Sequence, residues 1–352
     1  MRANSPARRV RPRSFLRRHG RSLLAGLGLL WAPVAVAQCA PPALSDAEML
    51  ALPDVKAVIE EAASIANAHG RLWRIEGETP SYLVGTFHVP GQGIEEPGPV
   101  ITDLVKNASR VFLELDQAAL DSALLEWASD PAKVFRDDGS RLSDGMSEAE
   151  IEAAKETFAR YGMPFALADQ MRPFMLFATL SVPPCALSQA ASGAGLDANI
   201  EAIARENNVP VTALETTQEQ FDALMSPEFG GNDDIVRLAL AMAVDEETFQ
   251  LTQTLYRTGH LGAIWAFGKV GLQEYVGDEA AETMTEAMWN VMLTQRNQRM
   301  VERMQEGLED GGAVVAVGGL HLVGDDGLVE LLRNKGYTLT RVGEGVAGGG
   351  QN

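Results

Sequence analysis

The sequence predicts an α/β (α+β) fold, in which a central mixed sheet is built from N-terminal and C-terminal α/β units and carries a large helical insertion. Three observations support this prediction. Apolar runs that favour strands lie near both ends of the chain, in RLWRIE and SYLVGTFHV (71–89) and in AVVAVGGLHLVG (313–324). Between them, the pattern over about 118–308 is mostly helical. The chain then closes with a strand, a loop, a helix and a strand, so α/β units flank the helical middle.

The first elements follow from local signals. Ser45 and Glu48 form a capping-box pattern, which predicts a first helix running to about Asn67. The two strand-like runs after it are separated by the turn-like GETP, which predicts a β-hairpin. A helix is expected over about 98–107, followed by a strand in RVFLELD (110–116).

The middle of the chain predicts helices that end at glycine or proline. They are expected over 118–129, from the Ser147–Glu150 capping box to near Gly162, in MRPFMLFATLS (171–181), and over 197–207 before the strand VPVTALETT (209–217). Residues 230–308 predict two long helices, broken around TGHLGAIWAFG (258–268). The tail predicts a strand, a helix over 326–335 that Gly336 ends, and a last strand.

The two ends of the chain differ in composition from the rest and set the predicted domain limits. Residues 1–37 hold eight arginines, the apolar run LLAGLGLLWAPVAVA and a small-x-small site at its end, which is the pattern of a secretory signal peptide. A retained anchor is the alternative, but the apolar run is shorter than the ~20 residues that a spanning helix needs. We therefore expect cleavage after Ala37, one domain over 38–342, a disordered tail over 343–352, and a periplasmic or secreted protein with no stable membrane span.

The charge of the processed chain limits its partners. Residues 1–37 contain eight basic and no acidic residues, so their removal leaves 21 basic and 48 acidic residues and a net charge of −27. Such a charge repels phosphate backbones and argues against nucleic-acid binding. Cys39 and Cys185 would enter an oxidising compartment, where they form a disulfide or remain as an exposed and a buried thiol. The sequence does not decide between these alternatives and does not fix the oligomeric state.

The pattern glycine-x-x-histidine occurs twice, each time directly after a strand-like run. Gly85 precedes His88 in YLVGTFHV, and Gly318 precedes His321 in AVVAVGGLHL. Ligands of α/β proteins gather beyond the carboxyl ends of strands, so histidines held there are candidates for chemistry. The alternative for each ring is a loop histidine bonded to nearby backbone. Glu114 lies in a strand between them and needs a metal or an arginine as a partner, unless its side chain faces water.

Other catalytic signals are weak. The sequence contains no H-E-x-x-H, G-x-S-x-G or G-x-x-x-x-G-K-[ST] motif. His69 and His260 stand beside glycines that end helices, where a ring that can carry positive charge suits the helix dipole. We interpret both as structural residues.

Several stretches together resemble the TraB/GumN family, also called the TraB/PrgY/GumN family. They are LWRIEGETPSYLVGTFHVP, VFLELD, MRPFML, GLDANI, VPVTALETTQEQ, RNQRM and VGGLHLVGDDGLVELLRNKGYTLTRV, in this order over about residues 70–342. That family is similar to the Tiki proteases, which depend on a divalent metal and use two G-x-x-H histidines and a glutamate. The resemblance implies that His88, His321 and Glu114 bind the metal. It also implies that Arg296, Asn297 and Glu215 lie near the site.

The leading hypothesis is a secreted metal-dependent hydrolase that acts on a peptide or a small-molecule substrate. Its cofactor would be a divalent metal ion (manganese, cobalt or zinc), with Glu114 as a ligand or the general base. The catalytic candidates are His88, Glu114, Arg296, Asn297 and His321. The rival hypothesis is a non-catalytic protein that holds a peptide or haem in the same pocket. Because both rings lie at strand ends, we expect their replacement to disturb the fold little.

Overall fold

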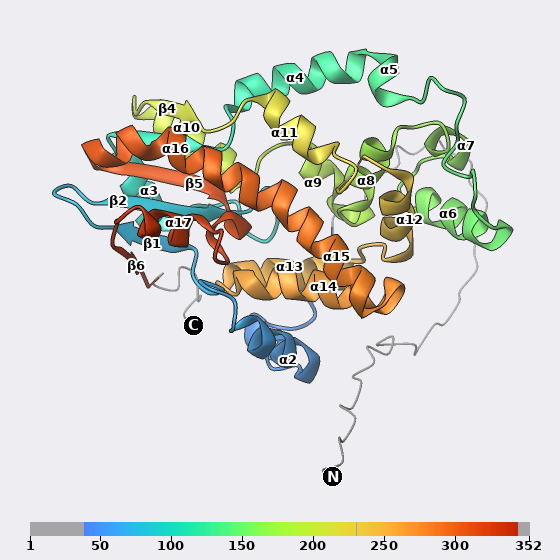
Figure 1. Ribbon diagram of the computed structural model, residues 1–352, viewed down its shortest axis with the longest axis horizontal. Coiled ribbons are helices and arrows are strands. Elements are labelled where there is room, and N and C mark those ends of the chain that lie inside the picture. The colour runs from blue at the N-terminus through green and yellow to red at the C-terminus, as the bar shows by residue number, and fades with distance from the viewer. Residues whose placement is uncertain (1–38, 230, 344–352) are drawn as a thin grey trace, which may run out of the picture.

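The computed structural model describes residues 39–229 and 231–343, in which a sheet flanked by helices adjoins a larger helical part (Figure 1). The predicted signal peptide (1–37) and all but the first residue of the predicted tail (343–352) lie outside the described residues. The predicted fold class is confirmed: the structure combines a six-stranded mixed sheet with many helices.

The sheet joins strands from both ends of the chain. Its order is β4-β3-β5-β2-β1-β6, and β4, β3, β5 and β2 run parallel to one another. The strands are β1 (Leu72–Ile75), β2 (Ser81–Thr86), β3 (Arg110–Leu113), β4 (Val211–Ala213), β5 (Ala313–Gly318) and β6 (Leu339–Arg341). The predicted hairpin is confirmed, because β1 pairs antiparallel with β2. β2 lies beside β5, with Thr86 opposite Gly318, so both G-x-x-H turns leave the same edge of the sheet.

Each face of the sheet carries its own apolar core, because successive side chains of a strand point to opposite faces. Val315 and Val317 pack on one face against α16 (Gln295–Asp310) and α17 (Leu328–Asn334). Val314 and Ala316 pack on the other face against α3 (Gly98–Lys106) and α10 (Leu196–Glu206). Figure 1 shows α16 crossing the near face of the sheet. Strands covered on both faces are apolar throughout, as β5 is, and they hold the turns at their ends rigidly.

The helical part has further cores of its own. One joins Leu142, Phe158, Leu176 and Val236, and another joins Met49, Val55, Leu251 and Ala263. The helices of this part are α4 (Gln117–Ser129), α5 (Pro131–Val134), α6 (Glu148–Arg160), α7 (Phe165–Ala168), α8 (Pro173–Leu180), η1 (Pro184–Ala186), α9 (Leu187–Ala191), α11 (Thr217–Leu224), α12 (Asp233–Ala241), α13 (Glu246–Arg257), α14 (Leu261–Val276), α15 (Asp278–Trp289) and the π-helical turn η2 (Asn290–Thr294).

Two of the predicted helix boundaries are wrong. The first helix is really two, α1 (Asp46–Leu50) and α2 (Pro53–Ala62), because Pro53 cannot continue a helix but starts one well. The region 230–308 holds α12 to α16 rather than two long helices, although the predicted break around 258–268 is confirmed between α13 and α14. Gly259 and Gly277, with φ of +79° and +83°, end α13 and α14 in conformations that glycine adopts without strain. The capping boxes at Ser45 and Ser147 are confirmed.

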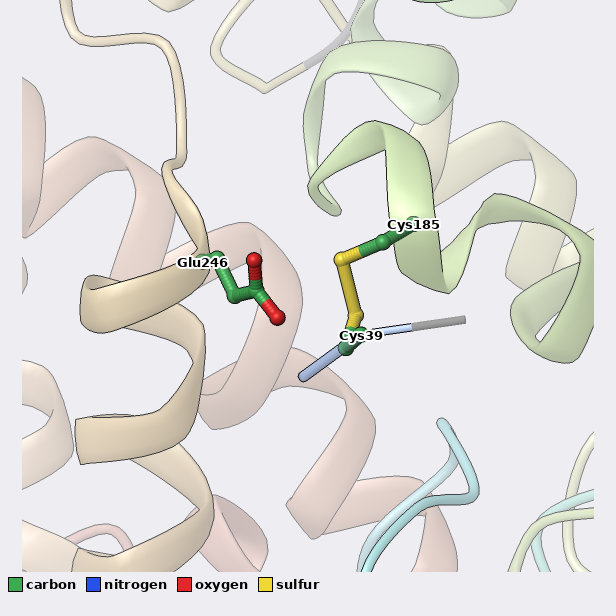
Figure 2. Close-up of side chains that lie close together, drawn as sticks. All are labelled: Cys39, Cys185 and Glu246. Carbon is green, nitrogen blue, oxygen red and sulfur yellow. A yellow bond between two sulfur atoms is a disulfide. The ribbon is translucent and has the colours of Figure 1, made fainter. Parts of the chain in front are cut away.

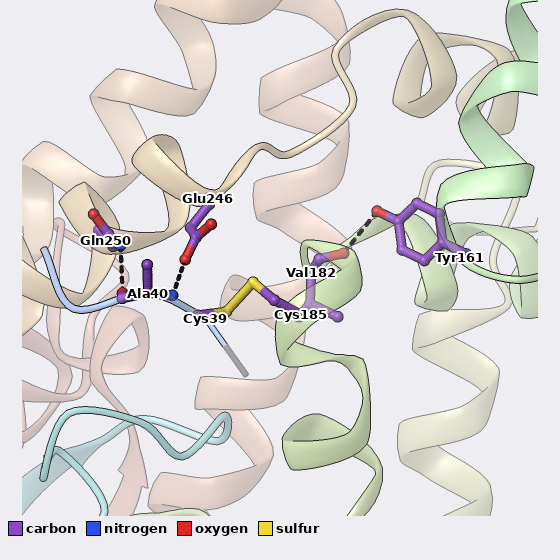
Figure 3. Close-up of a disulfide and its surroundings, with 7 residues drawn as sticks. All are labelled: Cys39, Ala40, Tyr161, Val182, Cys185, Glu246 and Gln250. Atoms are coloured by element: carbon purple, nitrogen blue, oxygen red, sulfur yellow. Dashed lines mark hydrogen bonds between the residues drawn. A yellow bond between two sulfur atoms is a disulfide. The ribbon is translucent and has the colours of Figure 1, made fainter. Parts of the chain in front are cut away.

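Of the two alternatives for the cysteines, the structure has the disulfide between Cys39 and Cys185, with Glu246 of α13 beside it (Figure 2). The adjoining segment is fastened to α13 as well. The Ala40 amide donates to the Glu246 carboxylate, and the Gln250 amide donates to the Ala40 carbonyl at 2.9 Å (Figure 3). The disulfide therefore ties the start of the described chain to η1 in the helical part.

Among the described residues, no single helix is both long and apolar enough to cross a membrane. One pair of helical segments, Pro173–Leu180 and Pro184–Glu206, reaches the required length and composition together but is bent by 97°.

Candidate functional site

Side chains from four parallel strands meet at one edge of the sheet. Glu114 is the first residue after β3, His88 lies two residues beyond β2, and Glu215 lies two residues beyond β4. His321 lies in η3 (Gly319–Leu322), the short 3-10 turn after β5. The carboxyl ends of parallel strands form a common edge, so residues far apart in sequence become neighbours there.

Glu114 is the centre of this group. Its Oε1 atom lies 3.8 Å from His88 Nε2 and 3.6 Å from His321 Nε2, and it accepts a hydrogen bond of 2.5 Å from the Gly318 amide. Its Oε2 atom accepts from Arg296 Nη2 at 2.7 Å. The structure therefore brings both motif histidines to one carboxylate.

Gly318 is a glycine because the site needs its space. A Cβ atom built there would lie 3.1 Å from both Glu114 Oε1 and His88 Nε2. A Cβ atom at Gly85 would lie 3.0 Å from the Cα atom of Gly319, in the turn beyond the neighbouring strand. In each motif the glycine permits a close approach that a side chain would block.

The ring of His321 is buried and its orientation is fixed. The Asn297 side-chain amide donates from Nδ2 to the carbonyls of His321 (3.3 Å) and Asp326 (2.8 Å), so its Oδ1 faces the His321 ring. His321 Nδ1 lies 2.6 Å from that oxygen and must donate to it, which leaves a lone pair on Nε2. Burial lowers the pKa of His321 to about 3 and keeps the ring neutral. The expectation that this ring contributes little packing is wrong, because its side chain is only 4% exposed.

His88 is the exposed member of the pair, with 57% of its side chain accessible. Its Nδ1 atom lies 3.1 Å from Asp197 Oδ1, at the start of α10, so a neutral ring donates through Nδ1 and keeps its lone pair on Nε2. The Asp197 carboxylate raises the pKa of His88 to about 9, and solvent around the ring screens this attraction. A Cβ atom at Gly195 would lie 2.5 Å from the His88 carbonyl oxygen, so the chain before α10 packs directly on the motif.

The sequence predicts no role for Asp197. It is an acidic residue in the first turn of a helix, which is a common and unremarkable position. Only the packing of α10 against the strand end shows that its carboxylate orients His88.

Arg296 joins the two buried carboxylates of the site. Its guanidinium donates to Glu114 and, through Nε and Nη2, to Glu215 at distances of 2.6 to 3.1 Å. Burial disfavours the charged forms, but the opposite charges more than offset it. They raise the pKa of Arg296 and, with His88 and the Gly318 amide, hold the pKa of Glu114 well below its usual range. Glu114 is therefore a carboxylate, available as a ligand or a base.

The donor set suits a divalent metal. Two imidazole Nε2 atoms lie beside one carboxylate oxygen, and each ring is held through Nδ1 by an oxygen, as metal-binding histidines usually are. Two ligands on one ion lie roughly 3–4 Å apart when metal–ligand bonds are about 2.1 Å long, and the two distances to Glu114 fall in this range.

The spacing of the whole set is less tight. Within residues 39–229 and 231–343, one group of three His, Cys, Asp or Glu residues has ligand atoms that all lie within 4.8 Å of one another, and it is Cys39, Cys185 and Glu246. The ligand atoms of His88, Glu114 and His321 are more widely spaced than that. The group at Cys39 is not a free metal site, because its two sulfur atoms are bonded to each other (Figure 2). A shared ion at Glu114 would require the exposed His88 ring to move toward His321.

The sequence was compared with known proteins. The model of the TraB/PrgY/gumN family matches residues 71–341, more than three quarters of the chain. The chain belongs to the TraB/PrgY/gumN family. YbaP of Shigella flexneri and YbaP of Escherichia coli K12, both described as uncharacterized proteins, are each 22% identical to this family member over 263 residues, covering 74% of this chain and 90% of YbaP. No solved structure matches the chain.

The remaining described histidines of this TraB/PrgY/gumN protein lie apart from Glu114 and contact each other. The rings of His69 and His260 meet edge to face at 4.7 Å. His69 Nδ1 also lies 2.8 Å from Arg341 Nη1, and His260 Nδ1 lies 3.0 Å from Thr258 Oγ1. These contacts agree with the structural role predicted for both residues.

Proposed function

We propose that this protein is a divalent-metal-dependent hydrolase that acts outside the cytoplasm, with peptide bonds as the first candidate substrate. One observation carries the proposal. Two histidines from different strand ends place their Nε2 atoms 3.8 and 3.6 Å from the same oxygen of the ionised Glu114 carboxylate, and each ring is oriented through Nδ1. A divalent cation bound there would replace the proton of His88 and take up the Nε2 lone pair of each ring.

The roles of the protein groups follow from their contacts. A divalent ion, when bound, polarises a carbonyl group and makes water a better nucleophile. His88 and His321 would hold it together with Glu114, or Glu114 would instead take a proton from the attacking water. Arg296 keeps Glu114 ionised and fixes one of its oxygens. Asn297 and Asp197 orient the two rings.

The location outside the cytoplasm rests on two features. The first is the composition of residues 1–37, which is that of a signal peptide. The second is the disulfide between Cys39 and Cys185, since such bonds persist mainly in oxidising compartments.

The rival function, a haem-binding protein, fits the site less well. A haem pocket that uses these histidines would be flat and apolar, whereas the described rings lie beside the charged Glu114, which itself pairs with Arg296. Peptide binding without hydrolysis uses the same groups and is separated from hydrolysis by the experiment below.

Metal analysis of the purified mature protein tests the proposal, after incubation with manganese, cobalt or zinc and removal of free metal. We expect about one ion per chain for the wild type and loss of that ion in His88→Ala and in His321→Ala. His260→Ala is the matched control and should keep it. Cleavage of a peptide mixture, followed by mass spectrometry, should depend on the same ion. Stoichiometric metal in both motif variants would overturn the site, and metal binding without cleavage would overturn the hydrolase.

A further inference from the structure

An apolar cavity lies between the turn that carries His321 and the helical part of the molecule. Its volume is about 320 Å³, near the lower limit of the roughly 300–1,000 Å³ typical of ligand pockets. The walls come from α8, α12, α14 and α15, and Leu320 of η3 completes them. Leu320 directly precedes His321, so the cavity adjoins the turn that carries this candidate metal ligand.

The cavity offers almost no free hydrogen-bonding groups. Its hydroxyl and charged side chains are Ser181, Lys269 and Thr285. Ser181 donates to the Phe177 carbonyl at 2.8 Å, Thr285 donates to a carbonyl of its own helix, and Lys269 forms an ion pair with Glu282 at 2.5 Å. A ligand group that enters the cavity must therefore be apolar, because a polar group would lose its water without gaining a partner.

Gly268 lies in the wall of the cavity on its solvent-exposed side. It lies inside α14, where glycine is less favourable than alanine, and a Cβ atom built on it would meet no heavy atom within 4 Å. The other glycines of α14 have close neighbours. A Cβ atom at Gly262 would lie 2.6 Å from the Ala68 side chain, and one at Gly271 would lie 3.1 Å from the end of Met242. Packing thus accounts for Gly262, while Gly268 leaves empty space in the cavity wall.

We propose that this cavity binds one large apolar side chain of a peptide substrate, of the size of leucine, methionine or phenylalanine. The inference rests on the proposed hydrolase function, in which a peptide bound at the metal site would place a neighbouring side chain beside Leu320. The small volume excludes a folded segment or a helix as the occupant. Apolar side chains that line the cavity, such as Trp265 and Met242, are only partly buried, so an occupant would remove apolar surface from water.

Ligand-detected NMR on the metal-loaded protein tests the proposal without requiring activity. The probes are N-acetylleucinamide, N-acetylalaninamide and hexanoate. We expect the leucine amide to bind at least about tenfold more tightly than the alanine amide, within the range for apolar pockets that discriminate by a few methylene groups. Equal binding of the two amides would overturn the proposal. Tighter binding of hexanoate would assign the cavity to acyl chains and overturn the proposal that it binds a peptide side chain.

Two variants of α14 test whether the preference for the leucine amide arises in the cavity. Gly268→Leu adds a large apolar side chain at the cavity wall and should reduce the preference for the leucine amide at least severalfold, while leucine favours the helix more than glycine does. Glu274→Leu adds the same side chain to an exposed position of the same helix and should keep the preference. Retention of the preference in Gly268→Leu would overturn the cavity as its source. If that variant does not fold, the comparison of the amides on the wild type still decides.

The outcome separates the cavity from the proposed function. Metal-dependent peptide cleavage without any side-chain preference would overturn the cavity assignment alone. A leucine preference in a wild-type protein that neither retains metal nor cleaves peptides would overturn the hydrolase alone.

Discussion

The two G-x-x-H turns share a sequence pattern and a place beside each other in the sheet, yet they create different surroundings. The side chain of His88 is 57% exposed and is oriented by the acidic Asp197. The side chain of His321 is 4% exposed and is oriented by the neutral Asn297. Glu114 lies beside both rings.

The difference indicates a division of labour. The His321 turn is backed by α16, which supplies both Arg296 and Asn297, and it forms the rigid half of the site. The His88 turn faces solvent and is held by α10 and by contacts near the disulfide. A repeated motif therefore predicts where two rings lie, while the helices packed behind each ring determine its charge and its mobility.

The largest expected effect comes from a substitution in the rigid half of the site. Arg296→Met should destabilise the protein by about 3–5 kcal/mol, because it leaves the Glu114 and Glu215 carboxylates buried with their main counter-charge removed. Urea denaturation followed by circular dichroism measures the change in the free energy of unfolding.

Lys155→Met is the matched control, since it removes a cation from an exposed ion pair with Glu152. It should cost less than about 1 kcal/mol. Equal costs for the two variants would show that the Arg296 cluster is solvated and that the rigid half does not exist as described.

The second prediction concerns the exposed half. The double variant Cys39→Ser, Cys185→Ser should lose about 2–4 kcal/mol of stability, as expected when a long loop is no longer closed. Val89, the residue after His88, packs on the cluster that includes Cys39. Amide hydrogen exchange should therefore speed up around Val89 and stay unchanged around His321. An equal increase in amide exchange rates in both turns would contradict the division into a rigid and an exposed half.

The third prediction compares the histidines directly. His321→Ala should cost about 1–3 kcal/mol, because it leaves the buried Asn297 Oδ1 without its donor. His88→Ala should change the free energy of unfolding by no more than about 0.5 kcal/mol, as surface substitutions usually do. Thermal unfolding of the two metal-free variants measures this difference. A larger loss for His88→Ala would reverse the assignment of rigid and exposed halves.

The features that the sequence predicts well are those that depend on local signals. The apolar runs before Gly85 and Gly318 predict strands, and the repeated glycine-to-histidine spacing predicts that both rings lie at strand ends. The capping boxes at Ser45 and Ser147 likewise lie within one helical turn. The fold class follows from the order of such segments along the chain.

The features that the sequence does not predict depend on contacts between distant segments. Asp197 is recognisable as a partner of His88 only after α10 packs against the end of β2. The orientation of His321 depends on α16, whose Asn297 lies 24 residues earlier in the chain. The helix end at Gly277 requires a positive φ that the periodic apolar pattern does not reveal. The metal itself stays a prediction.

The smallest expected effect concerns Asp197, the residue that orients the exposed ring. Asp197→Asn keeps an oxygen for His88 Nδ1 but removes the negative charge that makes the ring a stronger donor. We expect the dissociation constant of the metal to rise about tenfold, the lower end of the range for such partners. Competition with a chromophoric chelator measures it, and Glu274→Gln is the exposed control. Because the Asp197 contact is partly solvated, stability should change little. An unchanged metal affinity would mean that Asp197 only positions the ring or that His88 does not bind the ion.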